Sequence, residues 1–250
     1  MKLYLRYLWV LPLALLAFTA HGQEKIAPLG VVELFTSQGC SACPEADAAM
    51  QKMIEAGDVI GLSYHIDYWD YLGWTDTLAT PGNTKRQYDY AQALERSGVY
   101  TPQAIINGRE HANGNESALI YERLRSLKSA GQGLTVPVIS VINPSEISID
   151  VGAGAVDVHA EIVVVYFKRQ NTVTVQRGDN AGKRIAYWHN VTDVQVIGKW
   201  DGKPSRFTLP ISQLPNDEDV GLAVLVQRLN ESGKPKEIFG ASVLYAKLAG

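Results

Sequence analysis

The chain contains two cysteines, Cys40 and Cys43, and they closely follow an apolar stretch. That stretch, residues 31–35, reads VVELF, and its β-branched and aromatic residues are typical of a buried strand. Polar residues and a glycine separate it from Cys40, and Pro44, which suits the first turn of a helix, follows Cys43. A strand, a C-x-x-C pair and a helix in this order predict a redox-active dithiol at a helix start.

The first 22 residues have the three parts of a secretory signal peptide. Lys2 and Arg6 give a basic start, residues 8–18 form an apolar run, and the small residues Ala20 and Gly22 follow. The run is shorter than the ~20 apolar residues of a membrane-spanning helix, so an uncleaved anchor is the weaker interpretation. We therefore expect cleavage near residue 22, a secreted or periplasmic protein in which disulfides persist, and no membrane span in the mature chain.

The charge of the chain argues against nucleic acid as a partner. The chain has 23 basic and 26 acidic residues, and the predicted signal peptide carries two of the basic residues and none of the acidic ones. The mature chain is therefore more acidic than the net charge of −3 for the whole sequence. Nucleic-acid-binding domains usually present a basic patch instead.

Residues 23–133 are predicted to form an α/β domain. After the first strand the pattern indicates the following elements: a helix over 44–56, a strand over 59–66, a helix over 81–96, a strand from Pro102 to a hairpin turn at Asn107-Gly108, and a helix over 117–129. The helix over 44–56 has apolar residues at spacings of three and four and ends at Gly57.

Beyond residue 134 the pattern changes to short strands separated by turn residues. The strand-like segments are 136–142, 147–151, 156–167, 172–176, 185–200, 206–209, 220–229 and 238–246. Successive short strands of this kind predict an all-β, sandwich-like domain over 134–250. The predicted boundary between the two domains is the segment 131–133, which reads GQG.

The placement of the two cysteines predicts how they divide the chemistry. A helix N-terminus stabilises a thiolate through its free N–H groups and its dipole, so we expect Cys40 to be exposed and nucleophilic. Cys43 would then resolve the mixed disulfide.

Three other interpretations of the cysteine pair remain: a short structural disulfide, a structural zinc site and two free thiols without a role. A closed loop of about four residues stabilises a fold by only ~1.9 kcal/mol, and zinc needs four ligands.

Three segments of the chain resemble one family. VELFTSQGCSAC (32–43), HIDYWDYLGW (65–74) and VYTPQAIING (99–108) are similar to the secreted DUF1223 proteins, an uncharacterised group within the thioredoxin/glutaredoxin superfamily. The resemblance covers roughly residues 28–130 and implies a thioredoxin-like domain with a central mixed sheet and flanking helices. It also implies Cys40 as nucleophile, Cys43 as resolving cysteine, a Cys40–Cys43 disulfide, and a cis-proline at Pro102 that brings Thr101 beside the sulfurs.

The chain departs from thioredoxin at two places. Ser41-Ala42 stands between the cysteines instead of Gly-Pro, and the position of the buried aspartate of thioredoxin falls at Leu34. Glu33 is the neighbouring acid and a candidate proton acceptor, but the alternation of side chains along a strand points it to the other face.

The supporting site residues are predicted from the aromatic and acidic stretch 65–74. Asp67, Trp69, Asp70 and Trp74 either form a lip that receives a substrate or pack as an ordinary loop. His65 is either a hydrogen-bonded core histidine or, with the two cysteines, a ligand for Cu(I).

These observations together predict a thiol–disulfide oxidoreductase that acts on protein thiols or disulfides and exchanges electrons with a redox partner protein. No bound cofactor or metal is expected for that chemistry, and its direction stays open. Two alternatives are a non-catalytic binding module with a permanently closed disulfide, and a Cu(I) carrier that uses Cys40, Cys43 and His65.

Overall fold

The computed structural model describes residues 28–155, 159–214 and 219–245. Its helices are α1 (Cys43–Ala56), α2 (Pro81–Ala93) and α3 (Ser117–Ser129), with two short 3₁₀ helices, η1 (Asp70–Leu72) and η2 (Ile211–Gln213). Its strands are β1 (Gly30–Thr36), β2 (Val59–His65), β3 (Gln103–Ile106), β4 (Glu110–Asn113), β5 (Val138–Ile142), β6 (Glu146–Val151), β7 (Ala160–Thr174), β8 (Arg184–Trp200), β9 (Ser205–Pro210), β10 (Val220–Leu229) and β11 (Pro235–Tyr245).

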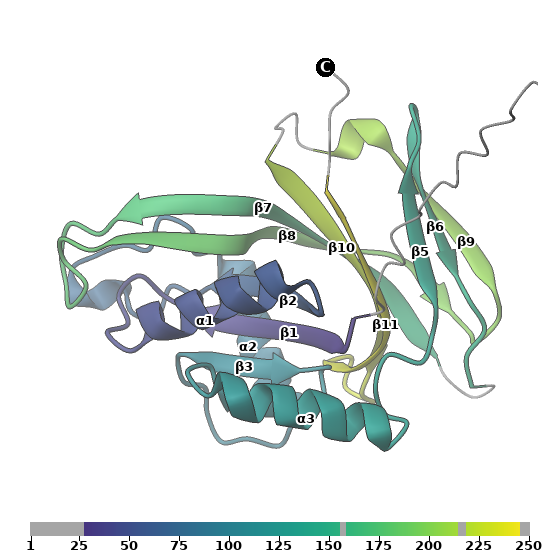
Figure 1. Cartoon of the computed structure of the whole chain (residues 1–250), viewed down its shortest axis with the longest axis horizontal. Coiled ribbons are helices and arrows are strands. Elements are labelled where there is room, and N and C mark those ends of the chain that lie inside the picture. The colour runs from purple at the N-terminus through teal and green to yellow at the C-terminus, as the bar shows by residue number, and fades with distance from the viewer. Residues whose placement is uncertain (1–27, 156–158, 215–218, 246–250) are drawn as a thin grey trace, which may run out of the picture.

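The described strands form one large mixed sheet and one small sheet (Figure 1). The large sheet has the order β11-β10-β7-β8-β2-β1-β3-β4, and the small one has the order β5-β6-β9. β1 pairs with β2 in parallel and with β3 in antiparallel fashion. A single parallel pair, Ser63 with Asn190, links β2 to β8 and joins the two halves of the large sheet.

The two faces of β1 lie in different surroundings, because successive side chains of a strand point to opposite faces. Val32 and Leu34 pack with α1 and α3 in one apolar cluster. Val31 and Phe35 belong to a second cluster with Tyr90 of α2 and with residues of β7, β10 and β11. The C-terminal strands of the sheet therefore fold back over the face of β1 and β2 that α2 also covers.

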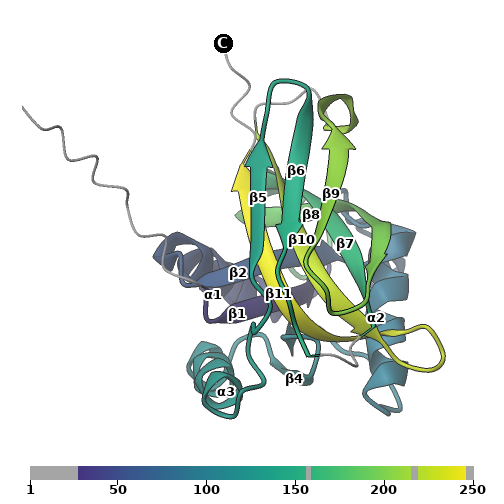
Figure 2. The same cartoon turned by 90° about the vertical axis from the view of Figure 1, so that its right-hand side faces the viewer.

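The small sheet packs on the other face of β7 and β10 (Figure 2). Ile147, Ile149 and Val151 of β6 lie in one cluster with residues of β7 and β10 and with Trp200 of β8. The strands after residue 134 are thus divided between two packed sheets, and the larger sheet also contains β1–β4, so they do not form an all-β sheet system of their own. The division into separate domains at residues 131–133 stays a prediction.

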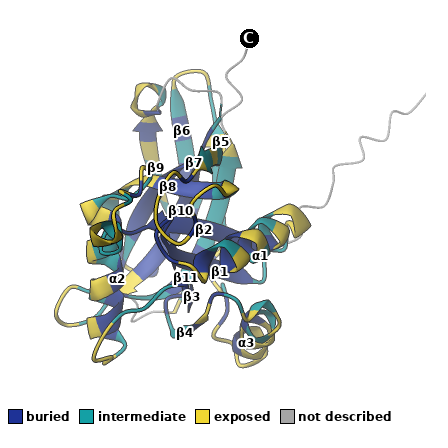
Figure 3. Ribbon diagram, turned by 90° about the vertical axis from the view of Figure 1, so that its left-hand side faces the viewer, coloured by how far each residue is buried: buried dark blue, intermediate teal, exposed yellow. Residues whose placement is uncertain are grey.

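A long hairpin formed by β7 and β8 reaches from the small sheet to the opposite end of the molecule. In Figure 1 it passes above α1, and its turn lies at the end of the molecule where α1 begins. Residues 172–176, predicted as a separate strand, are in part the continuation of β7, because Thr172 and Thr174 pair with β8. Figure 3 views the molecule from this end, with the central strands buried and the outer faces of the helices exposed.

The three predicted helices and the hairpin turn are confirmed, but α2 ends at Ala93 and not at residue 96. α3 has the predicted bounds, α1 ends at Gly57 with a φ of 75°, and Asn107 and Gly108 both have positive φ between β3 and β4. Among the described helices, none combines the length and the apolar character needed to cross a membrane. The predicted signal peptide, residues 1–22, lies outside the described residues, as does part of the predicted strand 156–167.

Candidate functional site

The two cysteines form a disulfide at the start of α1, with 5.4 Å between their Cα atoms. The N–H of Cys43, the first helical residue, donates to the carbonyl of Cys40 at 3.2 Å. Ala42 stands at the N-cap position and offers no side-chain cap. The free N–H groups and the positive end of the helix dipole therefore lie at the cysteine pair.

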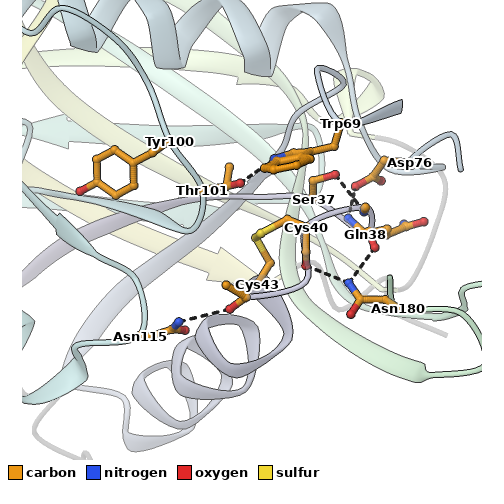
Figure 4. The surroundings of a disulfide bond; sticks show 12 residues. Ser37, Gln38, Cys40, Cys43, Trp69, Asp76, Tyr100, Thr101, Asn115 and Asn180 are labelled. Atoms are coloured by element: carbon orange, nitrogen blue, oxygen red, sulfur yellow. Dashed lines mark hydrogen bonds between the residues drawn. A yellow bond between two sulfur atoms is a disulfide. The ribbon is translucent and has the colours of Figure 1, made fainter. Parts of the chain in front are cut away.

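The disulfide is enclosed, and the prediction of an exposed Cys40 is wrong. Cys40 is 2% exposed and Cys43 is fully buried, whereas Ser41 and Ala42 between them are exposed. A helix start is open to solvent only when no other segment covers it. Here segments from distant parts of the chain lie against the loop that carries Cys40, among them Asn115, whose Nδ2 donates to the Ala42 carbonyl at 3.2 Å (Figure 4).

The first covering segment contains Thr101 and Pro102, whose peptide bond is cis, as the resemblance implied. The Trp69 indole Nε1 donates to the Thr101 hydroxyl at 2.7 Å, and both side chains lie on one side of the disulfide in Figure 4. Pro102 is buried and approaches α1: a Cβ on Gly114 would lie 3.0 Å from Pro102 Cβ and 3.1 Å from Ala46 Cβ. Of the predicted site residues, Thr101, Pro102 and Trp69 are thus brought to the cysteines.

The second covering segment is the loop that follows β2, and Gln38 fixes it. The backbone N–H of Gln38 donates to Asp76 Oδ2 at 2.7 Å. Its side-chain oxygen accepts a hydrogen bond from Trp74 Nε1 at 2.8 Å, and its amide nitrogen donates to the Thr77 hydroxyl at 3.2 Å. Trp74 therefore acts on the site through Gln38, two residues before Cys40.

The third covering segment is the tip of the β7–β8 hairpin. The Asn180 side chain, fully buried, donates from Nδ2 to the carbonyls of Gln38 at 2.9 Å and of Cys40 at 2.8 Å. The Asn180 Oδ1 accepts from Lys183 Nζ at 2.8 Å. The sequence holds no local signal for this contact, because the partners are separated by 140 residues or more.

A buried carboxyl group that the sequence analysis missed lies next to the disulfide. Asp47 follows Cys43 by one helical turn on the buried face of α1, a spacing that puts Cβ atoms about 5–6 Å apart. Among the described residues, neither of its carboxyl oxygens has a hydrogen-bond partner. Burial raises the pKa of Asp47 from 3.8 to about 7, against smaller lowering effects of the His65 charge and of the Thr36 hydroxyl, which lies outside hydrogen-bond geometry.

One sequence signal could have revealed Asp47. The apolar face of α1 is formed by Ala46, Met50 and Met53, and an aspartate at position 47 interrupts that face. An acid on the core side of an amphipathic helix, one turn from a cysteine, marks a candidate functional residue.

His65 is a core histidine paired with an acid. It is buried, and its Nδ1 lies 2.8 Å from Asp76 Oδ2. Burial alone would raise the pKa of Asp76, but the charge of His65 and hydrogen bonds from His65, Gln38 and Leu78 outweigh it and lower that pKa. In the described part of the chain, no three His, Cys, Asp or Glu side chains gather as metal ligands, so the site does not join His65 to both cysteines as a Cu(I) carrier would require.

Glu33 lies away from the disulfide, as the alternation of strand side chains indicated. Its carboxylate accepts a hydrogen bond from Arg86 Nε at 2.7 Å and another from the Tyr90 hydroxyl, both on α2. The Arg86 guanidinium also donates to Gln227 of β10 at 2.9 Å. Glu33 therefore anchors α2 and β10 to β1 on the face opposite α1, and it cannot exchange a proton directly with the cysteines.

The other acids of the predicted lip turn inward to hold the loop. Asp67 accepts a hydrogen bond from the Thr84 hydroxyl at 2.8 Å, and Asp70 accepts one from the Asp76 N–H at 3.0 Å. Neither bonds to the segment around Cys40. They fix the loop against α2 and position Asp76, which bonds in turn to Gln38.

Solved structures similar to this chain include one of high and one of low sequence identity. The protein AGR_C_4864 from Agrobacterium tumefaciens shares 53% sequence identity, with 90% of this chain and 97% of that chain covered and a TM-score of 0.82. HBP35 of Porphyromonas gingivalis, with 14% identity, 88% and 75% coverage and a TM-score of 0.64, shares the fold. Comparison with curated proteins gave no match.

The family comparison covers most of the folded chain. Residues 31–227 match the model described as "Protein of unknown function (DUF1223)". That range includes both cysteines, Pro102, Asp47 and Asn180. The chain belongs to the DUF1223 family.

Proposed function

We propose that this protein is a thioredoxin-like thiol–disulfide oxidoreductase that acts on protein substrates. The observation that carries the proposal is the unpartnered carboxyl group of Asp47, buried one turn after Cys43. A disulfide with a purely structural role has no use for a buried acid, whose charged form is costly to desolvate. A resolving cysteine does have a use for it, because its thiol must lose a proton before it attacks.

The reaction in the reducing direction has two exchanges. The Cys40 thiolate attacks one sulfur of a substrate disulfide, forms a mixed disulfide and releases the other substrate sulfur as a thiolate. Cys43 then gives its proton to the Asp47 carboxylate and attacks Cys40 Sγ. The Cys40–Cys43 bond forms, the second substrate sulfur leaves as a thiolate, and two electrons pass from the protein to the substrate. The reverse sequence oxidises a substrate dithiol.

The surroundings of the cysteines support these roles. The start of α1 stabilises the Cys40 thiolate, and a carboxyl group with a pKa of about 7 matches an acceptor that takes and returns a proton near neutral pH. The Thr101–Pro102 backbone supplies a wall near the first turns of α1, against which an extended substrate segment would lie. We further propose that this chemistry takes place outside the cytosol, as the predicted signal peptide indicates, and that a redox partner protein restores the cysteine pair.

The test is a disulfide-exchange assay with a protein substrate, comparing the wild type with Cys40→Ser. We expect activity in the wild type and its loss in the variant. Cys43→Ser should trap mixed disulfides through Cys40, and the double variant Cys40→Ser/Cys43→Ser, which cannot form them, is the control. Equal activity of wild type and Cys40→Ser would exclude Cys40 as the nucleophile.

The burial of Cys40 favours a second candidate, a binding module whose disulfide stays closed. Thiol–disulfide exchange requires the attacking sulfur to reach a cysteine sulfur, and only 2% of Cys40 is exposed. The reduction potential separates the two candidates. Inert structural disulfides typically lie below about −300 mV, whereas exchange-active pairs lie higher.

A further inference from the structure

We infer that Asn180 is a positioning residue that latches the tip of the β7–β8 hairpin, residues 175–183, over the disulfide as a gate controlling access to Cys40. The inference rests on the proposed redox function for its purpose, since a closed structural disulfide needs no gate. The tip comes from the C-terminal half of the chain, whereas the cysteines come from the N-terminal half (Figure 4). The gate thus gives that half of the protein a role at the redox site.

The tip is a defined loop of its own. The N–H of Val175 donates to the Lys183 carbonyl at 3.0 Å, and the N–H of Gly182 donates back to the Val175 carbonyl at 2.8 Å. Gly178 and Gly182 adopt the left-handed φ values of 77° and 80° that such a turn requires. A loop closed by its own hydrogen bonds can move as one unit.

Asn180 is the contact that ties this unit to the site. Within the tip, Val175 and Asn180 are buried while the other residues are exposed. The Asn180 amide nitrogen has two N–H groups, and it donates to the two carbonyls on either side of Gly39. Lys183 holds the amide oxygen and so fixes which end of the side chain faces the cysteine loop. Both hydrogen bonds join polar groups of the tip and of the cysteine loop, so we expect their loss to open the tip while the pairing of β7 with β8 stays intact.

Closure on this side completes the burial of Cys40. On the other side, Trp69 is tied to Thr101 by its indole N–H, and the disulfide lies between the two arrangements. A thiolate that attacks Cys40 Sγ needs part of this enclosure to open, because only 2% of Cys40 is exposed. The outer side of the hairpin tip is exposed, so a substrate or partner protein can contact it.

The experiment measures how fast dithiothreitol reduces the Cys40–Cys43 disulfide of the folded, full-length protein, with alkylation and mass spectrometry as the readout. Asn180→Ala should raise the second-order rate constant about tenfold, a factor that corresponds to about 1.4 kcal/mol of opening free energy. Lys183→Ala, a change at an exposed residue, should raise it about threefold because the amide is no longer held. Arg177→Ala, an exposed residue of the same tip, is the matched control and should leave the rate unchanged.

A second readout separates gating from general destabilisation. If a local opening exposes the disulfide, the reduction rate of the wild type changes little with urea well below the unfolding transition, because little surface is exposed. A rate that follows the urea dependence of global unfolding in every variant would overturn the inference. Equal rates for the wild type, Asn180→Ala and Lys183→Ala would overturn it too.

The two proposals fail separately in these experiments. The reduction rate reports on access to the protein's own disulfide and involves no substrate protein. An inactive wild type in the exchange assay counts against the oxidoreductase, whether or not the Asn180 variants speed up reduction. Unchanged reduction rates count against the gate, whether or not Cys40→Ser abolishes exchange.

Discussion

Asp47 lies one helical turn beyond Cys43 on the buried face of α1, and its carboxyl oxygens lack hydrogen-bond partners in the described structure. Because burial raises its pKa from 3.8 to about 7, the folded protein keeps a proton that the unfolded chain has already released between these pH values. This group therefore lowers the stability of the fold as pH rises from about 4 to about 7.

Asp47→Asn should remove this loss. We expect the difference in the free energy of unfolding between the variant and the wild type to shift in favour of the variant as pH rises across that range. The shift should reach on the order of 4 kcal/mol at pH 8. The cost of burying the new amide is the same at every pH, so the pH dependence of the difference isolates the carboxyl group. Urea unfolding of the oxidised proteins between pH 4 and 8 measures it. Glu45→Gln, an exposed change on the same helix, is the control, and a pH-independent difference would contradict the prediction.

The same substitution should slow the proposed chemistry. Resolution of a mixed disulfide by Cys43 requires loss of its proton, and Asp47 is the acceptor that we assign. We expect the rate of this step in the wild type to rise with an inflection near pH 7 and Asp47→Asn to lose that inflection. Single-turnover kinetics of a preformed mixed disulfide provide the measurement. A variant with the wild-type profile would remove Asp47 from the mechanism.

The ion pair between Glu33 and Arg86 should be important for stability and not for redox chemistry. The side chain of Glu33 is fully buried and that of Arg86 is 11% exposed, so removal of one partner leaves an uncompensated charge. We expect Arg86→Met and Glu33→Leu each to cost about 3–5 kcal/mol in urea unfolding, and the double variant to cost less than their sum.

An exposed ion pair provides the control for this prediction. Arg206 donates to Asp150 at 2.6 and 3.0 Å, but the two side chains are 67% and 45% exposed. Arg206→Met should therefore shift the unfolding midpoint far less than Arg86→Met, because water screens the pair. Similar shifts for both variants would show that the buried pair stabilises the fold no more than the exposed pair does.

His189 should make the fold sensitive to acid. Its Nδ1 donates to the Gly61 carbonyl at 2.8 Å, its Nε2 accepts from the Tyr245 hydroxyl at 3.2 Å, and burial lowers its pKa from 6.5 to about 4, with Arg169 adding to the effect. Between these pH values the unfolded chain therefore binds a proton at His189, whereas the folded protein does not. Stability due to this group falls as pH decreases from about 6.5 to about 4, by on the order of 3 kcal/mol.

The effects of His189 and Asp47 have opposite signs in overlapping pH ranges, so each one is visible only against its own variant. His189→Asn should flatten the acid side of the stability profile, and asparagine tolerates the φ of 48° at this position. His159→Asn, at an exposed histidine, is the matched control. Equal acid sensitivity of wild type and His189→Asn in urea unfolding would count against the assignment.

The sequence predicts those parts of the fold that short-range rules determine. Helix α1 has a proline in its first turn and a glycine after its last residue, and the Asn107-Gly108 turn follows from the two residues that form it. The direction of Glu33 follows from strand alternation alone. The burial of Asp47 can also be predicted from the sequence, because an acid stands on an apolar helix face.

The enclosure of the disulfide depends on contacts that no local pattern encodes. β8 meets β2 through the single pair Ser63 and Asn190, and Asn180 meets the Cys40 carbonyl across 140 residues. An asparagine in a predicted turn gives no sign of a long-range contact, because asparagine is common in turns for local reasons. The position of Cys40 at a helix end predicts that it is exposed. The prediction is wrong because another part of the chain covers that end.

The position of Asn180 along the chain also orders events during synthesis. Chains emerge from the ribosome N-terminus first, so Cys40 and Cys43 appear long before the hairpin tip that later covers them. An oxidant that forms the disulfide on the growing chain meets two open thiols. The same oxidant or any reductant that arrives after translation meets a bond already enclosed by the last third of the polypeptide.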